Sequence, residues 1–258
     1  MKQRGYEMVL DEILETTRER VRALDGMPFP VPVGGRRSLA GAIRGAAGRN
    51  AIIAELKFSS PTRGVIRPPT APDLVARDLV AGGCCALSVL TEPHFFGGSP
   101  DSIDRVRRAV EVPVLRKDFI IDPLQLEETR SLGADAVLLI ASLLGERLPG
   151  FVEKALALGL EPLVEVRTRK EAGTALTTGA ELIGVNNRNL QTMELDLSTT
   201  LALGPMIRRA GRTVVSESGI CVPGDIRTLR QACDAFLIGT SVMASEDPGK
   251  ALEDLVCA

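Results

Sequence analysis

The sequence contains no tryptophan, one tyrosine and one histidine, His94, among its 258 residues. A mechanism that needs two histidines, or a metal site built from several histidines, is therefore excluded. A serine hydrolase triad would depend on His94, and the chain lacks the G-x-S-x-G motif that presents the nucleophilic serine in many such enzymes. We therefore do not expect a serine hydrolase.

Cysteine is also scarce, and its spacing supports neither a disulfide framework nor a metal site. The number of cysteines is odd, and no two of them form a C-x-x-C pair. We expect them to be small, buried, apolar residues. The cysteines are Cys84, Cys85, Cys221, Cys233 and Cys257.

Long apolar segments are missing as well. No apolar run approaches the roughly 20 residues that a membrane-spanning helix needs, and the N-terminus has no secretory apolar segment. A net charge of −2 gives no electrostatic reason to expect nucleic acid or an anionic membrane as a partner. The apolar share of 45% and the charged share of 25% are ordinary for a globular enzyme. We expect a cytoplasmic protein that acts on a small molecule.

An N-terminal segment, residues 1–48, precedes the repeating part of the chain. Residues 6–24 have the apolar spacing of an amphipathic helix. The prolines and glycines of residues 26–35 end this helix and predict a stiff connector. Ser38 is placed to cap a short second helix that runs through Gly45.

From Ala51 onward, apolar strands alternate with amphipathic helices. The strands end near Lys57, Leu90, Asp118, Ala141, Val166, Asn187, Glu217 and Gly239. The helices fit at about 71–82, 100–109, 123–132, 146–158, 168–178, 198–209 and 224–232, with a last one after Pro248. Successive strand ends lie 21 to 33 residues apart, enough for one βα unit each. This predicts a single-domain (β/α)₈ TIM barrel over residues 1–258. A doubly wound sheet would not need eight units of such even size.

The first strand, Ala51 to Lys57, carries two opposite charges at its end. Glu55 and Lys57 are two residues apart, so both side chains point to the same side of the strand. Ser60 follows in a segment where Ser, Pro and Gly residues end the regular structure and predict a loop. A charged strand end of this kind is typical of an α/β active site, although a structural ion pair would look the same.

Polar side chains end most of the other strands too. In a barrel these ends meet at one face, where several strands together supply the functional groups. Two lysines near two or three carboxylates would have pKa values that diverge, as acid–base chemistry requires. A ring of ion pairs that closes the mouth of the barrel is the alternative. The groups are Ser88, Thr91, Glu92, Lys117, Glu165, Asn186, Arg188 and Glu217.

The last two strands end in small residues. Ser218-Gly219 and Gly239-Thr240-Ser241 leave backbone N–H groups free to bind a phosphate, and a short helix from Val242 could assist. Plain turn glycines are the alternative. Phe96 and Phe119 are expected to form an apolar wall for a planar ring, unless they are ordinary packing residues.

With these residues assembled, the chain resembles the indole-3-glycerol phosphate synthase family of tryptophan biosynthesis over nearly its whole length. The resemblance lies in the combination of several motifs, of which none is specific alone. They are Ile53-Ala-Glu-Leu-Lys-Phe-Ser-Ser-Pro61, Leu87-Ser-Val-Leu-Thr-Glu92, Phe96-Gly-Gly-Ser99, Val114-Leu-Arg-Lys-Asp-Phe119, Glu161-Pro-Leu-Val-Glu165, Gly184-Val-Asn-Asn-Arg-Asn-Leu190, Ser216-Glu-Ser-Gly-Ile220 and Phe236-Leu-Ile-Gly239. Phe58 and Ser59 replace basic residues common in the family's first loop. Thr240 stands where the family often has serine.

The resemblance implies closure of 1-(2-carboxyphenylamino)-1-deoxyribulose 5-phosphate to an indole, with loss of CO₂ and water and without a cofactor or metal. It makes Lys117 the general acid and Glu165 the general base. Lys57, held by Glu55, either stabilises the substrate carboxylate or acts as the acid in the dehydration, and Glu217 tunes the lysines. Asn186 is counted with these catalytic residues, where it helps to orient the substrate. Substrate contacts are implied for Ser60, Phe96, Phe119, Leu138, Arg188 and Leu190. Phosphate contacts are implied for Ser218, Gly219, Gly239 and Thr240.

The resemblance further implies that the N-terminal helices cover the mouth of the barrel. It leads us to expect a monomer that contacts other tryptophan-pathway enzymes. Two other functions stay open at this point. A Schiff-base aldolase would use a lysine at a strand end as its nucleophile, and a non-catalytic sensor would bind a phosphate ligand without turnover.

Overall fold

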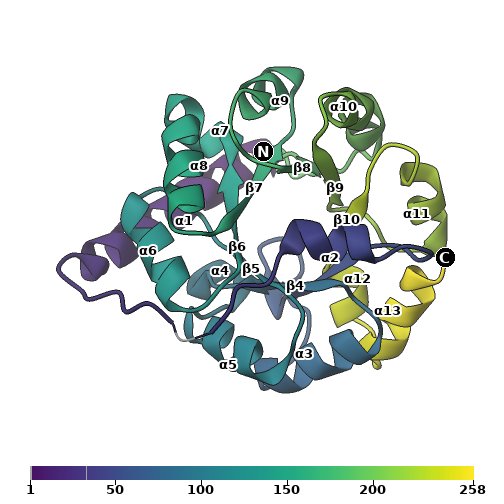
Figure 1. The fold of residues 1–258 in the computed structure, drawn as a ribbon, viewed down its shortest axis with the longest axis horizontal. Helices are drawn as coiled ribbons and strands as arrows, with labels where there is room; N and C mark the ends of the chain where they lie inside the picture. The colour runs from purple at the N-terminus through teal and green to yellow at the C-terminus, as the bar shows by residue number, and fades with distance from the viewer. Residues whose placement is uncertain (1, 33) are drawn as a thin grey trace.

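A barrel of eight parallel strands forms the centre of the molecule (Figure 1). The computed structural model describes residues 2–32 and 34–258, with side chains from residue 9 onward. Within these residues the strands close in the order β1-β10-β9-β8-β7-β6-β5-β4. The predicted TIM barrel is therefore confirmed. The strands are β1 (Ile52–Leu56), β4 (Ala86–Leu90), β5 (Val114–Lys117), β6 (Ala136–Ile140), β7 (Glu161–Val166), β8 (Leu182–Asn186), β9 (Thr213–Glu217) and β10 (Ala235–Ile238).

One long helix follows each strand, close to the predicted boundaries. These helices are α3 (Pro72–Ala81), α5 (Asp101–Ala109), α6 (Pro123–Ser131), α8 (Leu148–Ala157), α9 (Arg169–Leu176), α10 (Ser198–Arg209), α11 (Pro223–Leu229) and α13 (Pro248–Val256). Short elements that the sequence did not predict lie in the loops between them. They are the hairpin β2 (Ser59–Ser60) and β3 (Gly64–Val65), and the helices α4 (Pro93–Phe96), α7 (Ala141–Leu144) and η1 (Gly145–Arg147). The short helix expected from Val242 is α12 (Thr240–Met243), which begins two residues earlier.

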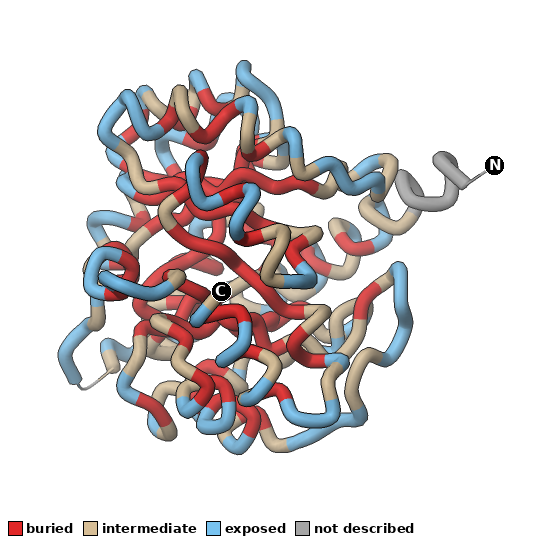
Figure 2. Tube along the Cα trace, turned by 90° about the vertical axis from the view of Figure 1, so that its right-hand side faces the viewer, coloured by how far each residue is buried: buried red, intermediate tan, exposed pale blue. Residues whose placement is uncertain are grey.

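The alternation of each strand divides the core into two layers. On β1, Ile52 and Ala54 pack outward with the apolar faces of the helices, whereas Ile53 packs inward with Leu115 and Val215 from other strands. Buried segments therefore fill the centre of the molecule, and exposed segments lie at its periphery (Figure 2). Because inward positions recur at every second residue, the last inward position of a strand brings its side chain to the mouth of the barrel.

The two N-terminal helices lie at opposite ends of the barrel. Helix α1 (Lys2–Leu24) contacts the carboxyl end of β5, where Arg20 binds Asp118. Helix α2 (Leu39–Gly45) lies at the amino ends of the strands and well apart from α1 (Figure 1). There the Ser38 hydroxyl and the Ala40 N–H donate to Glu161, the first residue of β7, over 2.6 and 2.9 Å. The expectation that the whole segment 1–48 covers the mouth is therefore wrong for α2.

Helix α2 lies there because its apolar residues fill the open bottom of the barrel. Leu39, Ala40 and Ile43 are buried in the inner layer of the core. The predicted cap is confirmed, since the Ser38 hydroxyl accepts a hydrogen bond from the Gly41 N–H over 2.9 Å.

We expect Leu39→Ala to destabilise the fold without impairing the site at the mouth. Leu39 is fully buried, and removing a buried leucine side chain costs roughly 2–5 kcal/mol through lost transfer free energy and an unfilled cavity. Urea unfolding gives the change in free energy, and Leu156→Ala on the exposed face of α8 is the matched control. An equal, small change in both variants would show that α2 does not seal the barrel.

The expectation that all five cysteines are buried is wrong. All five are free. Cys84 and Cys233 are buried as expected, but Cys221 and Cys257 are exposed, because they lie in a loop and at the end of the last helix. In the described part of the chain, no helix combines the length and the apolarity that crossing a membrane requires.

Candidate active site

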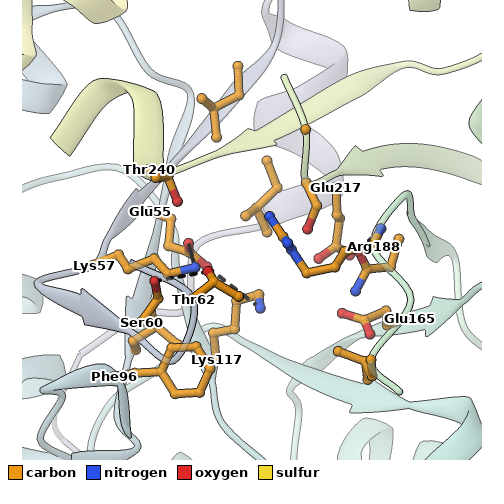
Figure 3. A pocket seen from close by; sticks show the side chains of 18 of the residues that line it. Glu55, Lys57, Ser60, Thr62, Phe96, Lys117, Glu165, Arg188, Glu217 and Thr240 are labelled. Carbon is orange, nitrogen blue, oxygen red and sulfur yellow. Dashed lines mark hydrogen bonds and ion pairs between the residues drawn. The ribbon is translucent and has the colours of Figure 1, made fainter. Parts of the chain in front are cut away.

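A pocket opens at the carboxyl ends of the barrel strands, and all the residues to which the family resemblance gave a role in the site line it. It unites charged groups from β1, β5, β7, β8 and β9 with the turns after β9 and β10 (Figure 3). The nominated residues that line it are Glu55, Lys57, Ser60, Phe96, Lys117, Phe119, Leu138, Glu165, Asn186, Arg188, Leu190, Glu217, Ser218, Gly219, Gly239 and Thr240.

The polar residues after the second strand, β4, lie outside this pocket. The Thr91 hydroxyl donates to Asp118 over 2.6 Å, and Ser88 is fully buried. Glu92 is fully buried too, and its carboxylate accepts from the backbone N–H groups of residues 94 to 96. These bonds cap α4 and so place Phe96 at the pocket. Glu92 therefore builds a wall of the site without entering it.

Two lysines share the carboxylate of Glu55. Lys57 Nζ lies 3.7 Å from Glu55 Oε2, and Lys117 Nζ lies 3.6 Å from Glu55 Oε1 (Figure 3). Gly239 of the neighbouring strand end makes room for Glu55, because a Cβ at that position would collide with the carboxylate. The i, i+2 spacing of Glu55 and Lys57 thus puts both into the pocket, as predicted. The approach of Lys117 comes from β5, two strands away.

The two lysines differ in basicity. Burial lowers the pKa of Lys117, but the negative charges of Glu55, Glu165 and Glu217 outweigh it, so its pKa lies above the usual lysine value. Burial also lowers the pKa of Lys57, and the charge of Glu55 does not compensate fully. Lys117 and Arg188 lower the Lys57 pKa further by repulsion. Lys117 is therefore held as an ammonium ion more firmly than Lys57.

The three carboxyl groups differ as well. Burial raises the pKa of Glu55, but the charges of Lys57 and Lys117 outweigh it, and the net shift is downward. Burial raises the pKa of Glu165 despite the opposing charge of Lys117 and a hydrogen bond from Asn186. Glu217 is shifted furthest upward, first by burial and then by repulsion from Glu165. Neither oxygen of Glu217 has a hydrogen-bond partner within the described residues.

An apolar wall closes one side of the pocket. The rings of Phe96 and Phe119 lie 6.1 Å apart at an angle of 40°. Leu138 and Leu190 line the same pocket from β6 and from the loop after β8. Lys57 Nζ lies 5.4 Å from the centre of the Phe96 ring, within the range of a cation–π contact. A planar ring would thus pack between apolar side chains while remaining close to the lysines.

Two turns of small residues form the opposite side. Ser218 and Gly219 both have positive φ angles, 67° and 83°, at the end of β9. The Ser241 hydroxyl donates to the Ile220 carbonyl over 3.1 Å and so joins this turn to the start of α12. Gly219 has the backbone angle that favours glycine, whereas Gly239 is needed for the space that Glu55 occupies.

Beyond Ser60, Arg188 and Leu190, the loops after β1 and after β8 supply pocket residues that the sequence did not predict. Thr62 and Arg63, between β2 and β3, line it, as do Met193 and Leu195 in the loop after β8. The Arg188 guanidinium donates to the Met193 carbonyl over 3.0 Å and closes that loop on itself. Short irregular segments have no hydrophobic periodicity from which their position could be predicted. For the loop after β1, the turn residues Ser-Pro-Thr-Arg-Gly were the one sequence feature that indicated a loop at the pocket.

The departures from the family's first loop have structural roles. The Phe58 side chain is partly buried against the outer layer of the core, where a charged side chain would be unfavourable. The Ser59 hydroxyl donates to the Phe95 carbonyl over 3.2 Å and ties the hairpin to α4. The described residues contain no group of three or more His, Cys, Asp or Glu side chains that could hold a metal ion.

Comparisons with known proteins agree with this architecture. The family model for indole-3-glycerol phosphate synthase matches residues 10–255. The indole-3-glycerol phosphate synthase of Methanopyrus kandleri is 43% identical over 250 residues, covering 96% of this chain and 97% of that protein. The one from Carboxydothermus hydrogenoformans is 42% identical over 265 residues, covering 96% and 100%.

A solved structure with much lower identity shares the fold alone. The thiamine phosphate pyrophosphorylase of Pyrococcus furiosus superposes with a TM-score of 0.58 at 18% identity, covering 80% of this chain and 93% of that one. The pocket of lysines, carboxylates and aromatic rings, together with the match over nearly the whole length, leads to one conclusion. The chain belongs to the indole-3-glycerol phosphate synthase family.

Proposed function

We propose that this pocket closes 1-(2-carboxyphenylamino)-1-deoxyribulose 5-phosphate to indole-3-glycerol phosphate, releasing CO₂ and water, as the family membership indicates. The observation that carries the residue assignments is the order of groups across the pocket. Apolar rings lie on one side, the small-residue turns lie on the other, and the lysines and carboxylates lie between them. A substrate with an aromatic ring at one end and a phosphate at the other fits this order.

Lys117 is the general acid in this proposal. Ring closure requires a proton on the ketone oxygen while the anthranilate ring carbon attacks, and Lys117 is kept protonated by three carboxylates. Lys57, which also pairs with Glu55, neutralises the substrate carboxylate or supplies the acid for the dehydration. The phenyl rings of Phe96 and Phe119 hold the aromatic ring near the sugar carbon, which lowers the barrier by proximity.

Glu165 is the general base, and the raised pKa brings this carboxyl closer to neutral pH than an ordinary glutamate. Glu217 lies in the same pocket and tunes the lysines and Glu165 through its charge state. Asn186, Arg188 and Ser60 orient the carboxylate and the hydroxyls of the substrate. Ser218, Gly219, Gly239 and Thr240 hold the phosphate. Since one chain supplies all of these residues, we further propose that the enzyme acts as a monomer.

Mixing the purified protein with the substrate tests the activity directly. Indole fluorescence should appear with time, and the background is low because the chain has no tryptophan. Binding without any fluorescence would instead identify a phosphate-ligand sensor. Borohydride trapping of a lysine adduct with a keto-sugar phosphate would identify a Schiff-base aldolase. The family comparisons favour neither alternative.

The pH dependence of kcat/KM should identify the acid. The base acts when deprotonated, so the raised pKa of Glu165 moves the acid limb above the usual glutamate value. The acid acts when protonated, so activity is lost as pH rises through its pKa. If Lys117 is the acid, the alkaline limb lies above the usual lysine value, and if Lys57 is the acid, below it. The assignment of Lys117 would be overturned if the alkaline limb lay below the usual lysine pKa and disappeared in Lys57→Gln.

Replacing the two turn glycines should separate their functions. Gly219→Ala must hold a positive φ and contact Leu195 and Leu197, so it distorts the phosphate turn and raises KM about tenfold, equivalent to roughly 1.4 kcal/mol. Gly239→Ala displaces the Glu55 carboxylate and should therefore lower kcat as well. Steady-state kinetics on both folded variants gives the comparison. A normal KM for Gly219→Ala would remove this turn from the phosphate site.

A further inference from the structure

Asp118 stands in the chain between two residues of the active site but faces the other way. All three residues border the pocket, but the alternation of the strand turns the Asp118 carboxylate away from it, toward Arg20 and Arg116. That carboxylate is completely buried. Oδ1 accepts from the Phe119 N–H over 2.8 Å, so the carboxylate holds the backbone next to the aromatic wall.

The same carboxylate is the end point of a bidentate ion pair from α1. Arg20 donates to Oδ1 and Oδ2 over 2.9 Å each. The guanidinium also donates to the Thr17 hydroxyl one turn earlier in α1, over 3.1 Å, which fixes its direction. Two parallel N–H···O bonds define an orientation as well as a distance.

The rest of the network belongs to the barrel wall and does not involve α1. Arg116, which is fully buried, donates to Asp118 over 3.1 Å and to the hydroxyls of Thr91 and Thr129. Burial raises the pKa of Asp118, but Arg20 and Arg116 outweigh it and hold the pKa far below the usual range. Asp118 therefore keeps a charged partner even without Arg20. Without Arg20 the carboxylate would stay paired with Arg116 but would lose the bidentate contact that fixes its orientation.

Helix α1 also contributes to the substrate end of the site. Leu10 and Leu14 line a cavity next to the active-site pocket, and Phe119, Ile140 and Leu190 border both cavities. The docked helix thus backs the apolar wall that the aromatic ring of the substrate would contact. The ion pair between Arg20 and Asp118 fixes the position of α1. Asp118 lies in the chain between Lys117, the proposed general acid, and Phe119 of the apolar wall.

We infer that Arg20 is a positioning residue, which couples the docking of α1 to the placement of Lys117 and Phe119 through its ion pair with Asp118. Arg20 does not line the active-site pocket, so it acts through Asp118. The inference rests on the proposed function, because it assigns Lys117 and Phe119 the roles given above. Small displacements of catalytic groups are costly, since a misplacement of about 1 Å lowers rates on the order of 100-fold.

The variant Arg20→Met tests this, because it keeps the length of the side chain and removes the guanidinium. We expect kcat/KM to fall about 10- to 100-fold, whereas inhibition by inorganic phosphate changes less than about twofold, since the phosphate turns lie on β9 and β10. Arg20→Lys keeps the charge without the bidentate geometry and should lie between Arg20→Met and the parent. Arg18→Met, on the same helix and exposed beside Glu15, is the matched control and should match the parent.

Amide hydrogen exchange gives a readout that does not need turnover. The Phe119 N–H, bound to Asp118, should exchange at least about tenfold faster in Arg20→Met, while the amides of β7 and β8 stay protected. If the parent protein shows no turnover, the proposed function is refuted. The exchange rate of the Phe119 amide would still test whether Arg20 acts through Asp118. Unchanged Phe119 protection, or equal weakening of substrate and phosphate binding, would overturn the inference. Should Arg20→Met fail to fold, Arg20→Lys is measured by the same two criteria.

Discussion

We expect Lys117→Met to lower kcat by about 10²- to 10⁴-fold, the range that general acid–base groups contribute, while the substrate still binds through its phosphate. Methionine keeps most of the stem of lysine and removes the ammonium group that lies 3.6 Å from Glu55. Residual activity is expected, because Lys57 pairs with the same carboxylate and can replace part of the proton donation.

A second consequence follows from the charge of Lys117. This charge lowers the pKa values of Glu165 and Glu217, so its removal should raise both. The acid limb of kcat/KM should therefore move to higher pH in Lys117→Met. Lys154→Met, on the outer helix α8 and paired with Glu127, is the matched control and should leave kcat unchanged. A kcat for Lys117→Met within about threefold of the parent would show that another group donates the proton.

Glu165→Gln should have an effect of similar size on kcat, again about 10²- to 10⁴-fold, with little change in KM. Glutamine keeps the shape of glutamate and the hydrogen bonding to Asn186 but cannot accept a proton as a base. The acid limb that belongs to Glu165 should disappear from the pH profile. Glu153→Gln on the exposed face of α8 is the corresponding control. A KM that rises as steeply as kcat falls would identify Glu165 as a binding group.

The double variant measures whether the two residues act on one bound molecule. Groups that work as a unit are strongly non-additive, so Lys117→Met combined with Glu165→Gln should lose less than the product of the single losses. Losses that multiply would mean that the two residues serve independent steps. In that case the assignment of acid and base to one ring closure would need revision.

Much of the fold and site could be predicted from the sequence because the relevant patterns are local. The alternation of apolar strands and amphipathic helices depends on neighbours within one or two turns of chain, and eight even units satisfy few architectures besides a barrel. The position of the site could be predicted because functional groups in a barrel lie at the carboxyl ends of the strands. Parallel strands in a barrel all end at one face, so Glu55, Lys117 and Glu165 had to meet once each was placed at a strand end.

Only the tertiary structure decided how those groups differ from one another. That Lys117 shares Glu55 with Lys57, and that the two lysine pKa values shift in opposite directions, depends on burial and on charges from strands far apart in the sequence. The sequence likewise could not separate Glu165, which lines the pocket, from Glu92, which caps α4. Glu165 lies within β7 and points into the barrel, whereas Glu92 lies beyond the end of β4, where its carboxylate turns back to cap α4.

The N-terminal segment shows the same division between local and long-range information. Both helices and the Ser38 cap follow from local spacing. Which end of the barrel each helix covers does not, because that depends on complementary surfaces formed by distant residues. Glu161 and the open bottom of the barrel place α2, and Asp118 places α1. Local periodicity determines the elements, whereas burial and long-range charge, which are properties of the closed barrel, determine the chemistry.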